Sequence, residues 1–218
     1  MKEIRDQLLP KGRVEIFVTR GRPALVLGAP IANVGNLPLY SSCEIDLSSV
    51  ELLEKQDLHN IVVNIGKDKV ITSLVSGSMN VVARMVMGDR GTIPSDSTVP
   101  KSPTSGMEAL YNNVYRADLD AVILNVGSAT VHEAKFIRTF SAVDVPITAF
   151  SNQANPVINE VGLVTADLIS VPLPRAPVAS PDLPLADEKL FSIRTFKSVP
   201  FEAANEIAVT IRYTIYIE

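Results

Sequence analysis

Two acidic residues, Asp118 and Asp120, flank Leu119 in the segment "RADLDAV". Because side chains alternate along a strand, a strand here would turn both carboxylates to one face. Glycoside hydrolases use paired carboxylates as acid and base, and carboxylates in oxygen-rich loops bind Ca²⁺. Two acids beside a turn are more often solvated, or paired with a cation such as Arg116. We therefore expect neither catalysis nor metal binding at this pair.

The other reactive side chains form no catalytic pattern. The chain has two histidines, His59 and His132, and "HEAK" lacks the second histidine of the zinc-binding H-E-x-x-H motif. No serine stands in G-x-S-x-G, and no glycine-rich loop fits a phosphate. The single cysteine, Cys43, is expected to be a small packing residue. We expect no catalytic, cofactor-binding or metal-binding residues, no cofactor, and a protein that is not an enzyme.

Glu160 lies in "NEVGL", within a largely apolar stretch, where a strand could turn its side chain inward. A buried carboxylate needs a partner, because removing an ionised group from water is costly. Arg138 and Arg194 are the candidate partners, both within copies of the repeated word "IRTF". We expect a structural ion pair, and we expect the two copies to be similar strands of one sandwich that could be neighbours.

Composition limits the class of protein. The 218 residues carry a formal net charge of −4, which argues against a general nucleic-acid binder, and the basic stretch Lys11 to Arg22 is expected to be a solvated face. One cysteine excludes an internal disulfide. The N-terminus has no apolar signal core, and the longest apolar run, "AVILNVG", is too short to span a bilayer. We expect synthesis in a reducing cytoplasm and no membrane partner.

Short apolar runs rich in Val, Ile and Thr predict a mainly β protein. The clearest run is 207–218, where alternate residues are apolar, and 13–19 alternates in the same way. Segment 24–30 is expected to form a hairpin with 13–19. The pattern favours an antiparallel β-sandwich of jelly-roll type. Two short helices are expected, one from about Ser49 to Asp57 after a capping-box signal, and one in "MEALYNNVYRADL".

Two proline-rich segments, 88–106 and 172–188, interrupt the pattern and predict long loops. The first divides the chain into a β-rich N-terminal docking part (1–87), a linker or extended arm (88–106) and a C-terminal β-sandwich (107–218). Whether the N-terminal part is a separate domain or shares one sandwich with the rest is left open.

The C-terminal half resembles a family of tailed-bacteriophage virion proteins. The resemblance lies in "NEVGL" (159–163), "LFSIRTFKSVPF" (190–201) and the closing strand "IAVTIRYTIYIE" (207–218). It covers roughly 107–218, and the N-terminal half matches no pattern. Tail-fibre, collar and baseplate-associated proteins share this β-sandwich, so the resemblance implies a virion setting.

Because a long repetitive shaft is missing, the neck, the collar or the upper tail is favoured over a full fibre. The implied partners are copies of the chain in a symmetric ring and neighbouring connector, tail or fibre proteins, with no direct nucleic-acid contact. The proline-rich segments would be arms that order on assembly. Two alternatives remain: a glycan-binding β-sandwich module, and a glycan hydrolase that uses Asp118 and Asp120.

Overall fold

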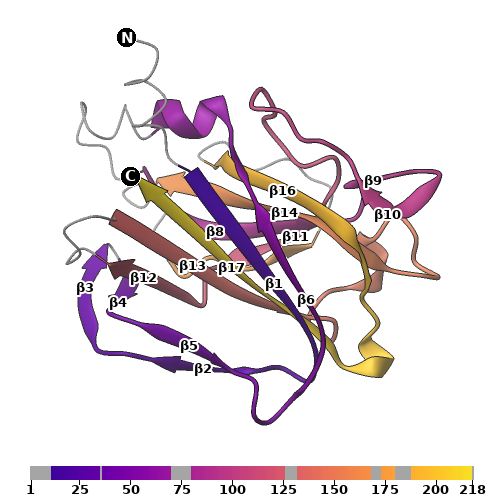
Figure 1. The fold of residues 1–218 in the computed structure, drawn as a ribbon, viewed down its shortest axis with the longest axis horizontal. Helices are drawn as coiled ribbons and strands as arrows, with labels where there is room; N and C mark the ends of the chain where they lie inside the picture. The colour runs from indigo at the N-terminus through magenta and orange to yellow at the C-terminus, as the bar shows by residue number, and fades with distance from the viewer. Residues whose placement is uncertain are drawn as a thin grey trace.

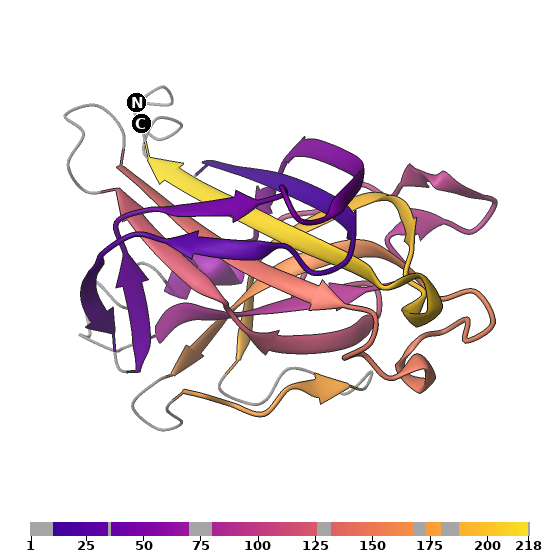
Figure 2. The ribbon, with the colours of Figure 1, turned by 90° about the horizontal axis from the view of Figure 1, so that it is seen from below.

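β-Strands dominate the computed structural model, which describes residues 11–34, 36–69, 80–125, 132–167, 173–179 and 188–217. The prediction of a mainly β, largely antiparallel protein is confirmed. Two large sheets lie one over the other, and two small two-stranded sheets extend from them (Figures 1 and 2).

The seven-stranded sheet contains both strongly alternating segments. Its strands, in spatial order, are β3 (Pro30–Val34), β4 (Leu37–Tyr40), β12 (Ala121–Asn125), β13 (His132–Ser141), β17 (Ile207–Ile217), β1 (Lys11–Arg20) and β6 (Glu51–His59). Neighbours are antiparallel except β4 and β12, which are parallel. The edges of this sheet are therefore β3 and β6.

The six-stranded sheet is made, in spatial order, of β15 (Val178–Ala179), β11 (Asn113–Asp118), β8 (Asn80–Gly88), β14 (Val157–Asp167), β16 (Lys189–Pro200) and β7 (Ile61–Val62). The small sheets pair β2 (Ala24–Leu27) with β5 (Cys43–Asp46), and β9 (Thr92–Ile93) with β10 (Asp96–Pro100). Two 3-10 turns, η1 (Ile147–Ala149) and η2 (Ala203–Asn205), and helical residues 64–69 complete the described elements.

One hydrophobic core fills the space between the two large sheets. Val14, Ile16 and Val18 of β1 reach it from one sheet, and Met85 and Met87 of β8 reach it from the other. In β17 the apolar set Val209, Ile211 and Tyr213 is fully buried in the same core. The predicted alternation of β1 and β17 is thus confirmed, because every second side chain faces the opposite sheet.

The outer faces of both sheets are also partly covered. Ala121, Ile123 and Ile137 point away from the main core and pack under Leu25, Tyr40 and Cys43 of the chain between β1 and β6. On the other sheet, Leu110 and Met107 pack against Val86, Val164 and Leu190. Strands covered on both sides have near-continuous apolar sequences, as "AVIL" at the start of β12 does.

Strands from both sides of residues 88–106 share both large sheets. In the seven-stranded sheet β1 and β6 adjoin β17, and in the six-stranded sheet β8 lies between β11 and β14. The segment 88–106 itself contains the β9–β10 hairpin, whose residues 94–99 are exposed at the periphery (Figure 1). The described parts of 1–87 and 107–218 therefore share one core.

The helix predicted from Ser49 to Asp57 is wrong, because this segment forms the edge strand β6. The residues that suggested a helix cap make a turn instead: the Ser48 amide donates to the Asp46 carboxylate. β6 then pairs with β1 along its whole length. Tertiary pairing with the free side of β1 overrides the local helix signal.

The helix predicted in "MEALYNNVYRADL" is also wrong. Residues 107–112 are irregular, and the strand β11 follows. The backbone N–H groups of Tyr111 and Asn112 donate to the Glu160 carboxylate, and a side chain that captures backbone donors competes with a helix. Leu110 and Val114 are buried without a helix.

Two further local predictions are wrong, and two are untested. β2 pairs with β5 and not with β1, so the predicted hairpin of 13–19 with 24–30 is wrong. The two "IRTF" words lie in β13 and β16, which belong to different sheets and are not neighbours. Two other sequence signals lie outside the described residues: "MKEIRDQLL" at the start of the chain, which could form two helical turns, and "VITSLVSG" (70–77), which predicts a strand.

Candidate functional site

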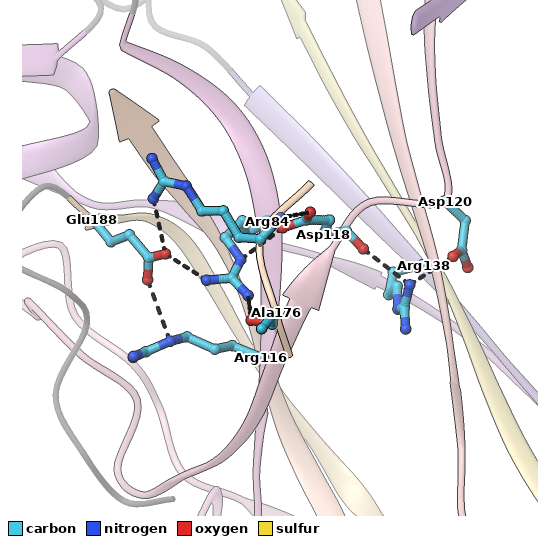
Figure 3. A network of polar contacts seen from close by, with 8 residues as sticks. Arg84, Arg116, Asp118, Asp120, Arg138, Ala176 and Glu188 are labelled. Carbon is cyan, nitrogen blue, oxygen red and sulfur yellow. Dashed lines mark hydrogen bonds and ion pairs between the residues drawn. The ribbon is translucent and has the colours of Figure 1, made fainter. Parts of the chain in front are cut away.

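Asp118 and Asp120 diverge and do not form a joint site. Figure 3 shows Asp118 directed at Arg84, whereas Asp120 points to Arg138 on the other side of the turn. Arg84 Nε lies 2.9 Å from Asp118 Oδ1, and the Arg175 amide donates to Asp118 Oδ2 at 2.7 Å. All four carboxylate oxygens of the pair therefore have protein partners, since Asp120 accepts from Arg138 Nη1 and the Thr139 amide.

Asp118 belongs to a buried ion-pair network between β8, β11 and the flanks of the second proline-rich segment (Figure 3). Arg84 and Glu188 are both fully buried, and Arg84 Nη1 donates to Glu188 Oε1 at 2.7 Å. Arg116 and Arg175 also lie within 4 Å of the Glu188 carboxylate. The Arg84 guanidinium donates to the Ala176 carbonyl as well. The network fixes 173–179 and Glu188 to the six-stranded sheet.

Glu160 is fully buried, as predicted, but its partners are not arginines. Its carboxylate accepts hydrogen bonds from the backbone N–H groups of Arg90, Tyr111 and Asn112 at 2.8–3.1 Å. Burial raises the pKa of Glu160 to about 7, against the lowering effect of these three donors. The side chain therefore joins both ends of the 90–112 segment to β14 and has no substrate-facing geometry.

The predicted ion pair of Glu160 with Arg138 or Arg194 is consequently wrong. Arg138 pairs with Asp120, and Arg194 donates to the backbone carbonyl of His59 at 2.7 Å. The amide donors of Glu160 come from residues far from it in sequence, so no local spacing indicates them. All three donors lie in the first proline-rich segment or next to it. The backbone N–H groups there make few hydrogen bonds to neighbouring strands, so they need other acceptors.

The remaining candidates from the sequence are the cysteine and the two histidines. Cys43 packs beside Ile123 and Ile137, and burial raises the pKa of its thiol. His59 ends β6, and His132 begins β13. Among the described residues, no group of three or more His, Cys, Asp or Glu side chains is placed to hold a metal ion.

A different feature stands out on the surface: the hairpin 24–46, which runs out through β2 and β3 and returns through β4 and β5. No charged residue occurs from Pro23 to Cys43. On the outgoing side, Val26 and Leu27 of β2 and Ile31 of β3 are 55%, 39% and 46% exposed. The returning strand is buried instead, at Leu37, Leu39 and Ile45, because it packs on the seven-stranded sheet.

β3 is also a free edge of the seven-stranded sheet. An edge strand presents unpaired N–H and C=O groups, and soluble proteins protect such edges with charges or prolines. The opposite edge, β6, is protected by Glu51, Glu54, Lys55 and Asp57. β3 has only Pro30 at its start. The outgoing side of this hairpin, residues 24–34 with β2 and β3, is the candidate functional surface, and we call it the apolar edge.

The sequence matches no protein-family model and no curated protein. No helix within the described residues is long and apolar enough to cross a membrane.

Proposed function

We propose that the protein is a structural component of a tailed-bacteriophage virion, a neck, collar or upper-tail protein that assembles into a ring of identical copies. Its two-sheet body is proposed to be a β-sandwich of jelly-roll type. Its role is structural, and it contacts neighbouring connector, tail or fibre proteins. It is proposed to catalyse no reaction and to bind no cofactor, metal, nucleic acid or membrane.

The observation that supports assembly is the apolar edge. Three large apolar side chains are exposed on the uncharged segment 24–34, Val26 and Leu27 on β2 and Ile31 on β3, and β3 is an open edge of the seven-stranded sheet. In a protein that acts alone, such a strand invites uncontrolled pairing and aggregation. In a ring it is buried against the next copy, and homo-oligomers commonly close in this way. The virion setting is supported by the resemblance of 107–218 to tailed-phage proteins.

The first proline-rich segment, 88–106, fits the same proposal as a contact arm. Residues 94–99 form the exposed end of the β9–β10 hairpin, with Val99 42% exposed. The base of this hairpin is fixed, because the Thr195 hydroxyl donates to the Lys101 carbonyl and the Gly91 amide donates to Asn159. An arm fixed at its base and exposed at its end is suited to reach a neighbouring subunit.

Immuno-electron microscopy tests the virion assignment. Antibodies against the purified chain should label one fixed position at the neck, collar or upper tail of the particles that carry it. Labelling confined to unassembled protein, with none on intact particles, would overturn the assignment.

The second candidate is a glycan-binding module, and one observation favours it. A polar groove of about 430 Å³ lies across the outer face of β1, β13 and β17, lined by Arg13, Glu15, Glu133, Lys135, Arg212, Thr214 and Tyr216. The groove offers the donors and acceptors that sugar hydroxyls need. It ranks second because its charges already pair with one another, Arg212 with Glu15 at 2.6 Å and Lys135 with Glu133 at 2.7 Å. Binding on a glycan array that is lost in Arg212→Ala would support it.

A further inference from the structure

One edge of the six-stranded sheet is covered by a short extended segment, residues 173–179, which we call the strap. Its last two residues form β15, which pairs with Tyr115 and Arg116 of β11. β8 lies on the other side of β11. Without the strap, β11 would therefore be the end strand of this sheet.

A bare β11 would be a hazard for the protein. It would expose unpaired backbone N–H and C=O groups, which invite pairing with strands of other chains. Its sequence, "NVYRAD", has no proline to block such pairing. The opposite edge of the sheet, β7, has only two residues, so β11 is the longer of the two end strands that would need protection.

Polar contacts dominate the attachment of the strap. The Arg175 amide donates to Asp118 Oδ2 at 2.7 Å, and the Ala176 carbonyl accepts from Arg84 at 2.9 Å. Of the apolar side chains in the strap, only Leu173 is buried. Segments with few buried apolar contacts open at a lower free energy than the core strands. The strap is thus able to open while the two sheets stay together.

Glu188 lies at the centre of this attachment. Three guanidinium groups from three elements converge on its carboxylate: Arg84 of β8 at 2.7 Å, Arg116 of β11 at 3.4 Å and Arg175 of the strap at 3.3 Å. Figure 3 shows Arg84 and Arg116 reaching different oxygens of Glu188. The like charges of the three arginines repel one another, and the carboxylate between them offsets that repulsion. Loss of its charge would push the strap arginine away from the two sheet arginines.

We propose that the strap is a cover for the β11 edge that opens independently of the core, and that the charge of Glu188 keeps this cover closed. When that charge is lost, the strap detaches as a unit and exposes the edge, while the two large sheets remain packed. This role goes beyond the proposed function, because β11 lies outside the apolar edge and the cover acts within a single chain.

Hydrogen exchange measured by mass spectrometry tests the cover in Glu188→Gln. This variant keeps the size of the side chain and removes its charge. Exchange in 173–179, and in the β11 amides that face it, should become faster by on the order of tenfold or more. Exchange in β17, a central strand of the other sheet, should remain as in the wild type.

The matched control is Glu51→Gln. Its carboxylate pairs with Arg20 at the exposed edge strand β6, far from the strap in the sheet order. The same loss of one charge from one ion pair should leave exchange in 113–118 and in 173–179 unchanged.

A double variant tests the repulsion between the arginines. Adding Arg175→Met to Glu188→Gln removes the strap charge that Arg84 and Arg116 repel, while the backbone amide at 175 can still donate to Asp118. Exchange in β11 should therefore be slower than in Glu188→Gln alone. Exchange that is equally fast in both variants would contradict the role of charge in holding the strap.

Circular dichroism establishes that each variant is folded. If Glu188→Gln does not fold, Asp118→Asn repeats the measurement, because Asp118 accepts the Arg175 amide and its side chain is less buried, at 20% exposed. Unchanged exchange in 113–118 in a folded variant would overturn the proposal. Equal acceleration in 113–118 and 207–217 would overturn it too, since the whole molecule would then open and the strap would have no opening of its own.

Discussion

The hydroxyl of Tyr213 in β17 donates a hydrogen bond of 2.8 Å to the backbone carbonyl of Val161 in β14. The bond passes through the core from one large sheet to the other, and Tyr213 is fully buried. Burial raises the pKa of this phenol, so the hydroxyl keeps its proton and remains a donor. It is a polar link between the two sheets.

Removal of this link should destabilise the fold without opening a cavity. Tyr213→Phe keeps the ring and deletes the hydroxyl, and we expect the free energy of unfolding to fall by about 1 kcal/mol. Urea denaturation measures the change. Tyr216→Phe, on the outer face of the same strand, is the matched control and should leave the midpoint unchanged. Equal effects at both positions would contradict the cross-sheet role.

The buried Arg84–Glu188 pair should be far more sensitive to substitution. Arg84→Met keeps much of the side-chain volume but leaves Glu188 without its closest cationic partner, at a fully buried position. Breaking a buried pair by removing one member costs about 3–5 kcal/mol, because the remaining charge loses part of its compensation. We expect a loss of this size in the free energy of unfolding, measured by urea denaturation.

The control for that variant is Arg20→Met. Arg20 pairs with Glu51 at 2.7 Å, but both side chains are more than half exposed. An exposed pair contributes between zero and about 1 kcal/mol. If Arg84→Met were as mild as Arg20→Met, the network would not hold the second proline-rich segment.

Glu160 should make stability depend on pH. Its folded pKa of about 7 exceeds the value of 4.5 for an unperturbed glutamate, so the folded protein binds this proton more tightly than the unfolded chain. The stabilisation is complete below pH 4.5 and is lost as pH rises to about 7. The contribution of this carboxyl to the unfolding free energy should fall by about 3 kcal/mol over that interval.

Glu160→Gln removes the titration and isolates its effect. The difference in unfolding free energy between wild type and variant should shrink as pH rises from 5 to about 7, because only the wild type loses the protonated carboxyl. Chemical denaturation at a series of pH values measures it. Glu108→Gln, at an exposed glutamate, should follow the wild-type curve. A difference that stays constant with pH would contradict the assignment.

Calcium should leave the protein unaffected, since the oxygens of Asp118 and Asp120 all have partners within the chain. A site with a dissociation constant of about 0.1 mM would raise the melting temperature by roughly 5–10 °C in about 10 mM Ca²⁺. We expect no shift in a thermal scan with calcium or with a chelator. A shift of that size would indicate that Asp118 and Asp120 bind calcium, against our expectation.

Strands were predictable from the sequence where one face packs on the core and the other does not, because apolar and polar residues then alternate. β1 and β17 alternate because one side meets the core, and the inward position of Tyr213 follows from the sequence. β6 was not predictable in the same way. Leu52 and Leu53 are both exposed, so apolar residues do not mark a buried face, and β6 pairs with β1, which is distant in sequence. Local capping signals cannot report a partner strand more than thirty residues away.

The candidate sites were harder to predict. The burial of Glu160 follows from the largely apolar stretch around it, whereas its three amide donors come from loops that only the tertiary fold brings together. The apolar edge does have a sequence signal, the absence of charge from Pro23 to Cys43. That signal indicates exposure only when the strand is known to lie at a sheet edge.

Mass photometry of the purified wild-type chain across concentration tests the central claim most directly, with negative-stain images of any large species. Assembly through the apolar edge predicts closed rings of one defined copy number that grow in abundance with concentration. A strict monomer at every concentration would contradict the claim that this protein assembles with copies of itself.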